Sequence, residues 1–253
     1  MKAAYRCDVG LCRQSNQDSA FCADYPVGPV SALFVVADGM GGHKAGELAS
    51  REMLRFFLQN IRSYEKGALL PYNTREFWSR LVRDAGNRLF IRARGNDELE
   101  GMGTTFVSAA FFQKRIAVAS IGDSRAYVLT PGGVLRQVTH DHSLVQEMMD
   151  AGQLSPEDAR IHPRRNIITR AAGVSYDVSP DVFFLSQSEV KRLLLCSDGL
   201  HALVSDDTIQ SILRREEQPD VLAQALLDAA LAAGGNDNIT AVVVDLSEGE
   251  KEC

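Results

Sequence analysis

The sequence predicts an α+β fold in which antiparallel β-sheets pack together and paired helices lie outside them. Strand-like and helix-like segments come in blocks along the chain rather than in strict alternation, which favours this class over a doubly wound α/β fold. The 253 residues are 45% hydrophobic and 24% charged, an ordinary globular composition that can bury one core of good size. We therefore expect a single domain over residues 1–246, followed by a polar tail at 247–253.

The first half of the chain contains short strands and two long helices. The apolar run from Leu33 to Ala37 is typical of a buried strand, because turn residues bound it. Between 45 and 61, apolar residues fall largely on one face of a helix. In order, we expect strands at 2–8 and 20–24 around a polar loop at 10–18, the buried strand, a helix at 45–61, a connection at 67–74 and a helix at 75–94.

The second half opens with strands and closes with two helices and a strand. Ser143 and Ser155 each predict the start of a short helix, because a serine hydroxyl can cap it. Residues 150–178 lack long apolar runs, and we expect them to form a mobile surface flap. The remaining expected elements are a meander of strands near 104–112, 115–121, 124–130 and 134–138, strands at 181–185 and 191–196, helices at 206–216 and 219–233, and a strand at 239–246.

Four acids lie at the ends of four apolar strands. Asp38, Asp123 and Asp198 each follow an apolar run, and Asp237 comes just before one. The glycines after Asp38 would let the backbone come close to whatever this carboxylate holds. Carboxylates gathered at strand ends, without histidine pairs or a CxxC motif, indicate a site for a hard cation. Oxygen ligands suit magnesium or manganese rather than zinc.

The overall charge and the cysteines exclude several classes of protein. A formal charge of −6 argues against a nucleic-acid binder, which needs a basic surface. The five cysteines are odd in number and form no CxxC motif, which favours a reducing cytoplasm. A zinc site made from Cys7, Cys12 and Cys22 is a remote alternative. No signal peptide is evident, and no run approaches the roughly 18 apolar residues of a membrane span.

Six short motifs in a fixed order carry a resemblance to a known family. They are Arg13…Asn16-Gln17-Asp18, Asp38-Gly39-Met40-Gly41-Gly42-His43, Gly103-Thr104-Thr105, Gly122-Asp123-Ser124-Arg125, Ser197-Asp198-Gly199 and Asp237-Asn238-Ile239-Thr240. Together they resemble the bacterial branch of the metal-dependent protein phosphatases, the protein phosphatase type 2C family. The resemblance implies a central β-sandwich flanked by helical pairs in four layers, αββα. It also implies a two-metal centre at one end and hydrolysis of serine/threonine phosphoproteins.

The resemblance assigns the metal ligands residue by residue. Asp38 resembles the family's carboxylate that bridges both metals, and Gly39 resembles the glycine whose carbonyl helps to bind one of them. Asp198 and Asp237 look like the remaining direct ligands. Asp18 resembles an acid that acts through metal-bound water. The implied cofactors are two Mn²⁺ or Mg²⁺ ions, with a weaker third ion at Asp123 and Asp198.

Two further residues resemble the family's substrate-handling groups. Arg13 resembles the phosphate-binding arginine, whose planar fork matches two phosphoryl oxygens. His43 stands where the family has a histidine proposed as the general acid for the leaving oxygen. Simpler alternatives remain for each: Arg13 as a surface arginine, His43 as a turn histidine facing water, and Asp123 as a hairpin-turn acid. We interpret Asp141-His142-Ser143 as a helix start rather than a metal site.

The chemistry of a phosphate monoester explains why acids should gather around metals. Two divalent ions about 3.5–4 Å apart acidify a bridging water toward hydroxide and neutralise the phosphoryl oxygens. Direct attack by that hydroxide needs no phosphoenzyme. Without metal the acids would repel one another, so we expect local disorder at this rim in the metal-free protein. An acyl hydrolase is disfavoured because Gly-x-Ser-x-Gly is absent, and no cysteine lies in a loop suited to a phosphocysteine.

The resulting hypothesis is a cytoplasmic phosphatase of phosphoserine and phosphothreonine proteins that depends on magnesium or manganese. The resemblance implies phosphoprotein partners and an opposing bacterial serine/threonine kinase, and we expect a monomer. Two alternatives stay open. One is a binding module that has kept the fold without catalysis. The other is a phosphatase for small phosphate esters or for one dedicated antagonist protein.

Overall fold

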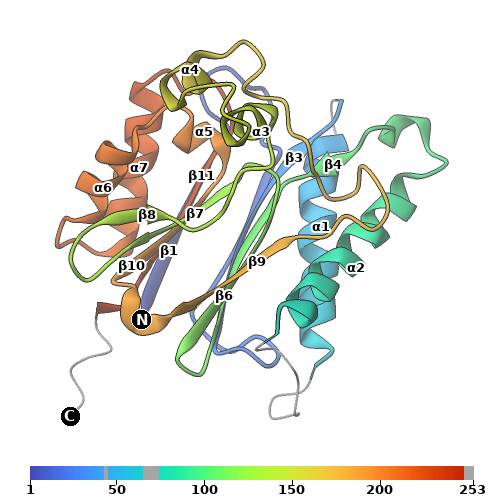
Figure 1. Cartoon of the computed structure of the whole chain (residues 1–253). Helices are drawn as coiled ribbons and strands as arrows, with labels where there is room; N and C mark the ends of the chain where they lie inside the picture. Colours follow the sequence, from blue (N-terminus) through green and yellow to red (C-terminus); the bar gives the residue numbers. More distant parts are fainter. Residues whose placement is uncertain (43–44, 65–73, 248–253) are drawn as a thin grey trace.

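Two antiparallel sheets pack face to face, and helices cover both outer faces (Figure 1). The computed structural model describes residues 1–42, 45–64 and 74–247. Helices α1 (Ala45–Arg62) and α2 (Arg75–Ala93) lie on one side of the sandwich, and α6 (Asp206–Leu213) and α7 (Pro219–Ala232) on the other. The predicted α+β class and its four layers are confirmed.

The strands of each sheet come from distant parts of the chain. The first sheet has the order β1 (Lys2–Asp8), β11 (Ile239–Asp245), β10 (Arg192–Cys196), β7 (Arg125–Leu129) and β8 (Leu135–Gln137). The second has the order β2 (Asp18–Ala23), β3 (Ala32–Met40), β5 (Phe106–Phe112), β6 (Arg115–Ile121) and β9 (Asp181–Ser186), and β4 (Gly103–Thr104) pairs with the end of β3. The first strand of the chain therefore pairs with its last strand.

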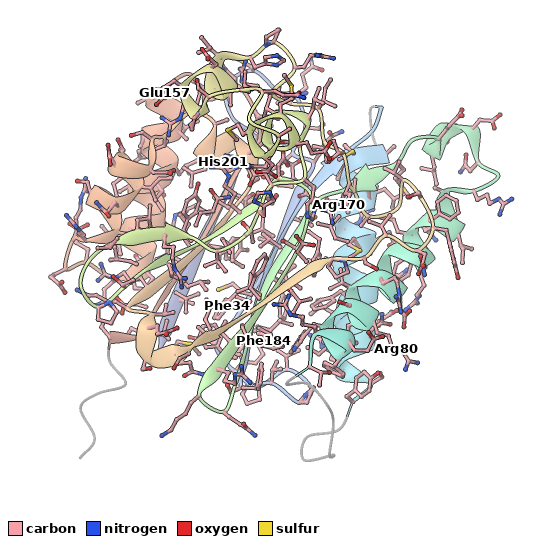
Figure 2. All side chains as sticks on the ribbon, viewed as in Figure 1. Phe34, Arg80, Glu157, Arg170, Phe184 and His201 are labelled. Atoms are coloured by element: carbon pink, nitrogen blue, oxygen red, sulfur yellow. The ribbon has the colours of Figure 1, made fainter. Side chains whose placement is uncertain are left out.

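Three apolar layers hold the sandwich together. Phe34 and Phe111 meet edge to face between the two sheets, with Phe34 near the centre of the molecule in Figure 2. Trp78 is fully buried between the helix pair α1–α2 and the second sheet. Leu226 of α7 packs in the third layer, against the first sheet. Burial of this much apolar surface is the main stabilising term of the fold.

The other helices are short and lie at one end of the sandwich. They are α3 (Leu144–Asp150), α4 (Pro156–Ile161) and α5 (Asp198–His201), with single 3₁₀ turns at Asp97–Leu99 and Gln187–Glu189 elsewhere. Ser143 and Ser155 cap α3 and α4 as predicted, because each hydroxyl accepts a backbone N–H three residues on. The flap, residues 150–178, contains α4 and otherwise irregular backbone. Its first part lies above the strand ends next to α5, and residues 172–177 run down along β4 and α2 (Figure 1).

Two local predictions were wrong, and one element was not predicted. The predicted meander is divided between the sheets, since β6 pairs with β5 and β9 whereas β7 pairs with β10 and β8. Residues Gly122 to Ser124 therefore carry the chain from one sheet to the other instead of forming a hairpin. The expected strand at 104–112 is broken at Thr105, between β4 and β5. Helix α5, a single helical turn that begins at Asp198, was not predicted.

Candidate metal centre

Asp38 and Asp18 face each other across two neighbouring strands. Asp18 opens β2 and lies directly opposite Asp38 of β3 in the register, so their side chains project from the same face of the sheet. Thr105 fixes the backbone of Asp38: its hydroxyl accepts the Asp38 N–H at 3.0 Å, and its own N–H donates to the Asp38 carbonyl at 2.8 Å. The Thr104 hydroxyl donates to the same carbonyl at 2.8 Å. The Gly103-Thr104-Thr105 motif thus holds Asp38 in place.

Gly39 brings the first turn of α1 onto the end of β3. A Cβ at this position would lie 1.9 Å from the carbonyl oxygen of Gly46, so no larger residue fits. The Gly39 N–H donates to the carbonyl of Gln17 at 3.1 Å. A glycine is therefore required here for packing, whatever its carbonyl binds.

Asp18 connects the two sheets at the end of the sandwich. Its Oδ2 atom accepts hydrogen bonds from the hydroxyls of Ser197 at 2.7 Å and Thr240 at 2.6 Å, both in the first sheet or next to it. Its Oδ1 atom is buried and has no hydrogen-bond partner among the described residues. Burial, followed by the charges of Asp198 and Asp237, raises the pKa of Asp18 to about 7.

Asp198 and Asp237 lie next to the ends of two strands of the first sheet, and they approach Asp18 and Asp38 from that side. Asp198 follows β10 and is the first residue of α5, and Asp237 precedes β11 by two residues. The side chains of Asp38 and Asp198 interact, and this contact counteracts part of the rise in the pKa of Asp198. Burial, with the charges of the neighbouring acids, holds the pKa of Asp38 well above its ordinary value. The pKa of Asp198 is raised by burial and by Asp237.

Asp123 joins the same group of carboxylates from the crossing between the sheets. It is 6% exposed, and its Oδ1 atom has no partner in the described part of the chain. Burial, then Asp198 and Asp141, raises its pKa to about 8. The hairpin alternative for this acid is wrong, because β6 and β7 lie in different sheets.

Arg13 is the cationic side chain of this rim. Its Nη2 atom donates to Oδ2 of Asp237 at 2.7 Å, and the arginine side chain is 54% exposed. The bond to Asp237 raises the pKa of Arg13. Asn238 fastens the loop that carries Arg13, since its amide donates to the carbonyls of Val9 at 2.9 Å and Ser15 at 3.0 Å. His43, the predicted general acid, lies outside the described residues.

The donor set fits a hard divalent cation. Three buried carboxylate oxygens, on Asp18, Asp123 and Asp198, have no hydrogen-bond partner in the described ranges. These donors are oxygen atoms alone, which suits Mg²⁺ or Mn²⁺. Among the described residues, no group of three or more His, Cys, Asp or Glu side chains has the geometry to hold a metal ion without rearrangement.

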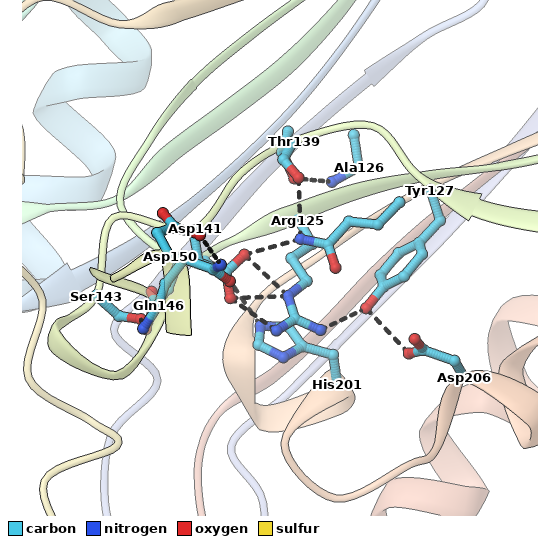
Figure 3. Close-up of polar contacts among 12 residues, drawn as sticks. Arg125, Ala126, Tyr127, Thr139, Asp141, Ser143, Gln146, Asp150, His201 and Asp206 are labelled. Carbon is cyan, nitrogen blue, oxygen red and sulfur yellow. Dashed lines mark hydrogen bonds and ion pairs between the residues drawn. The ribbon is translucent and has the colours of Figure 1, made fainter. Parts of the chain in front are cut away.

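A second group of polar residues lies beside this rim and differs in its charges (Figure 3). Arg125 binds Asp141 through Nε at 3.0 Å and Nη2 at 2.7 Å, and its Nη1 atom donates to the Tyr127 hydroxyl at 2.7 Å. The Tyr127 hydroxyl in turn donates to Asp206 at 3.3 Å. His201 lies next to this group, near the end of the sandwich (Figures 2 and 3). A cavity of about 340 Å³ connects both groups, because Asp123, Asp198 and Arg125 all line it.

Sequence reasoning missed the residues that orient the acids. Ser197, Thr240 and Asn238 stand within the quoted motifs, but no role was assigned to them. The only available signal was a hydroxyl or amide next to each acid.

None of the helices in the described ranges combines the length and the apolar character that a membrane span requires. The four described cysteines, Cys7, Cys12, Cys22 and Cys196, all have free thiols.

Known proteins match this chain over most of its length. A family model described as protein phosphatase 2C matches residues 13–232. The serine/threonine phosphatase stp of Listeria monocytogenes is 38% identical over 246 residues, which are 97% of this chain and 96% of the relative. The serine/threonine protein phosphatase PstP of Mycobacterium tuberculosis is 37% identical over 97% of this chain, which spans 45% of PstP.

Solved structures agree with these sequence matches. The serine/threonine phosphatase Stp1 from Staphylococcus aureus superposes with a TM-score of 0.88 at 34% identity, covering 97% of this chain and 94% of Stp1. The catalytic domain of PstP in complex with two manganese ions superposes with a TM-score of 0.80 at 35% identity, covering 96% and 97% of the two chains.

Proposed function

The chain belongs to the protein phosphatase 2C family and is a serine/threonine phosphatase, and from this premise we propose that it hydrolyses phosphoserine and phosphothreonine in proteins directly, with two Mn²⁺ or Mg²⁺ ions. The observation that carries the proposal is the set of buried carboxylate oxygens without partners on Asp18, Asp123 and Asp198, within the described residues. Such oxygens are costly to bury unless a cation neutralises them.

The acids would have different roles in binding the two metal ions. Asp38 would bridge the two ions, with Asp198, Asp237 and the Gly39 carbonyl as further ligands, and Asp18 would act through water. The ions, when bound, supply a water acidified toward hydroxide and positive charge for the phosphoryl oxygens. The hydroxyls of Ser197 and Thr240 support this assignment, since they fix one oxygen of Asp18 and leave the other to face the site. The structure of the PstP catalytic domain in complex with two manganese ions supports a centre of two such ions.

Arg13 would orient the substrate and His43 would protonate the leaving oxygen. The Arg13 guanidinium lies half exposed beside Asp237, so it can turn its fork toward a phosphoryl group that enters from solvent. Two parallel hydrogen bonds would fix the phosphorus relative to the acids. The serine or threonine oxygen is a poor leaving group and needs a proton, which His43 could give near neutral pH.

A third ion and the cellular setting complete the proposal. Asp123 would bind the third ion together with Asp198. We propose that residues 1–246 form one catalytic domain, monomeric and cytoplasmic, whose flap at 150–178 helps to select phosphoprotein substrates. Free thiols on the described cysteines are in keeping with a reducing compartment. The opposing enzyme would be a serine/threonine kinase, since hydrolysis of these esters reverses its product.

The test is hydrolysis of a phosphothreonine peptide with Mn²⁺, with chelator, and with the Asp38→Ala variant. Turnover that needs both the metal and Asp38 would support the proposal. Metal binding without turnover would indicate a binding module, and turnover that survives chelation and the mutation would overturn the assignment of the acids. A parallel panel of small phosphate esters distinguishes a protein phosphatase from an enzyme for metabolites.

A further inference from the structure

The crossing loop that carries Asp123 is fastened by several elements at once. The Gly122 N–H donates to Nδ1 of His142 at 3.1 Å, and the His142 N–H donates back to the Gly122 carbonyl at 2.9 Å. The Ser124 hydroxyl meets the Thr105 hydroxyl at 2.7 Å. These three contacts fix Gly122 and Ser124, the residues before and after Asp123. None of them involves the backbone of Asp123.

His201 supplies the contact to Asp123 itself. Its Nε2 atom lies 3.0 Å from the main-chain carbonyl oxygen of Asp123. A carbonyl oxygen can only accept, so Nε2 carries the hydrogen and donates it. Burial lowers the pKa of His201 to about 3, so the ring is neutral at pH 7 and keeps this tautomer. The sequence indicated no role for this histidine.

The same helical turn also carries Asp198. Asp198 is the first residue of α5 and His201 is the last, three positions later, so their side chains lie on one side of the turn. Asp198 is the foremost charge acting on Asp123. Helix α5 therefore presents one carboxylate and ties down the backbone of the other.

We propose that His201 is a positioning residue that sets the distance between Asp123 and Asp198, and thereby the affinity of this carboxylate pair for Mn²⁺. The inference rests on the proposed function, because the pair is the third-ion site named there. Both carboxylates line the cavity of about 340 Å³, so an ion can reach them without passing through the core. Groups outside the ligand shell that orient ligands typically change metal affinity by about 10–100-fold.

The experiment is a Mn²⁺ titration followed by the electron paramagnetic resonance of free Mn²⁺. His201→Leu removes the donor and keeps the bulk, whereas His201→Gln keeps an N–H near the position of Nε2. We expect His201→Leu to weaken the weaker site by about 10-fold, since it acts through the backbone and not on the carboxylate. His201→Gln should restore most of that affinity. The two tight ions should be bound as before in both variants.

A double-mutant cycle with Asp123→Asn isolates the effect on this carboxylate. Asp123→Asn alone should abolish the weaker site, and adding His201→Leu should then cause no further loss. The control is His140→Leu, because His140 bonds Asp150 in α3, at 2.8 Å, and does not contact Asp123. This control should leave all the sites unchanged. If His201→Leu folds poorly, His201→Asn replaces it, since its amide is too short to reach the carbonyl.

The outcomes separate this inference from the proposed function. A weaker site that His201→Leu leaves intact would overturn the positioning role, and so would equal loss at every site. A further loss in the Asp123→Asn background would also overturn it. Wild-type protein that binds two ions and no third would refute the inference while the phosphatase assignment stands. Wild-type protein that binds no Mn²⁺ would overturn both.

Discussion

Asp123 and Asp141 are two equally buried carboxylates with opposite surroundings. They are 6% and 7% exposed, and both line the same cavity. Asp141 receives three hydrogen bonds from Arg125 and one from Gln137, whereas Asp123 keeps an oxygen without a partner among the described atoms. Burial alone therefore does not identify a site. A buried acid that is paired with an arginine stabilises the fold. A buried acid without such a partner can bind a metal ion instead.

Strand β10 shows the same contrast along its length. Arg192 opens the strand, is 2% exposed, and donates to Asp245 at 2.7 Å and to the carbonyls of Leu213 and Arg215. Asp198 lies two residues beyond the other end, and its Oδ1 atom has no hydrogen-bond partner among the described residues. One end of the strand is thus neutralised within the protein, and the other end faces the rim of acids.

The largest expected effect comes from changing the central acid. Asp38→Asn should lower turnover of a phosphothreonine peptide by at least about 10³-fold, because Asp38 is the proposed bridging ligand and would hold both ions. The metal-free variant should be no less stable than wild type, since one of several mutually repelling acids has gone. Thermal unfolding in chelator measures the second effect. A variant that is inactive and also unfolded would not support a role confined to the site.

The next largest effect comes from the paired acid. Asp141→Asn leaves the Arg125 guanidinium without its anion and should cost about 3 kcal/mol of unfolding free energy. Asp123→Asn should instead leave the metal-free stability unchanged or raise it. Urea unfolding of both variants in chelator gives the comparison. Equal destabilisation by the two changes would contradict the distinction between paired and unpaired acids.

A smaller effect is expected from pH. The pKa values of Asp18 and Asp123 are raised from 3.8 to about 7 and about 8. Between about pH 4 and pH 8 the folded protein therefore binds more protons than the unfolded chain. The stability of the metal-free protein, measured in chelator, should fall as pH rises through this range, by several degrees in Tm. Saturating Mn²⁺ should remove the decline and should protect the rim from protease. A metal-free protein that gains stability across this range, with protection unchanged by Mn²⁺, would refute the prediction.

The smallest effect should come from Arg13→Lys. The charge is retained but the planar fork is lost, so kcat/KM should fall by about 10-fold, the value of one charged hydrogen bond. Mn²⁺ affinity should not change, because the proposed role of Arg13 is to bind phosphate and not metal. Unchanged kinetics would make Arg13 a surface arginine paired with Asp237.

The class of fold and the acids could be predicted from the sequence because their signals are local. An apolar run that ends in Asp-Gly shows both a strand and its exposed end, and Ser143 and Ser155 mark the helices they cap. Helix α5 has one turn, too short for any periodicity to show. The crossing at Gly122-Asp123 has the composition of a hairpin turn, so only the pairing of β6 with β9 shows otherwise.

The orienting contacts could not be predicted because they join distant residues. The hydrogen bonds from Ser197 and Thr240 to Asp18 span 179 and 222 residues. No local pattern shows such a contact. The acids proposed as metal ligands could be picked out from the sequence. The groups that orient their carboxylates became evident only in the structure.

The pairing of β1 with β11 has a consequence for the protein during its synthesis. The second sheet needs only residues up to Ser186, so a growing chain can complete it early. The first sheet lacks β11, its link between β1 and β10, until residues 239–245 leave the ribosome. Asp237 and Thr240 arrive at that same moment. On the proposed ligand set, a nascent chain that lacks Asp237 would be inactive, and the complete rim of acids would form late in folding.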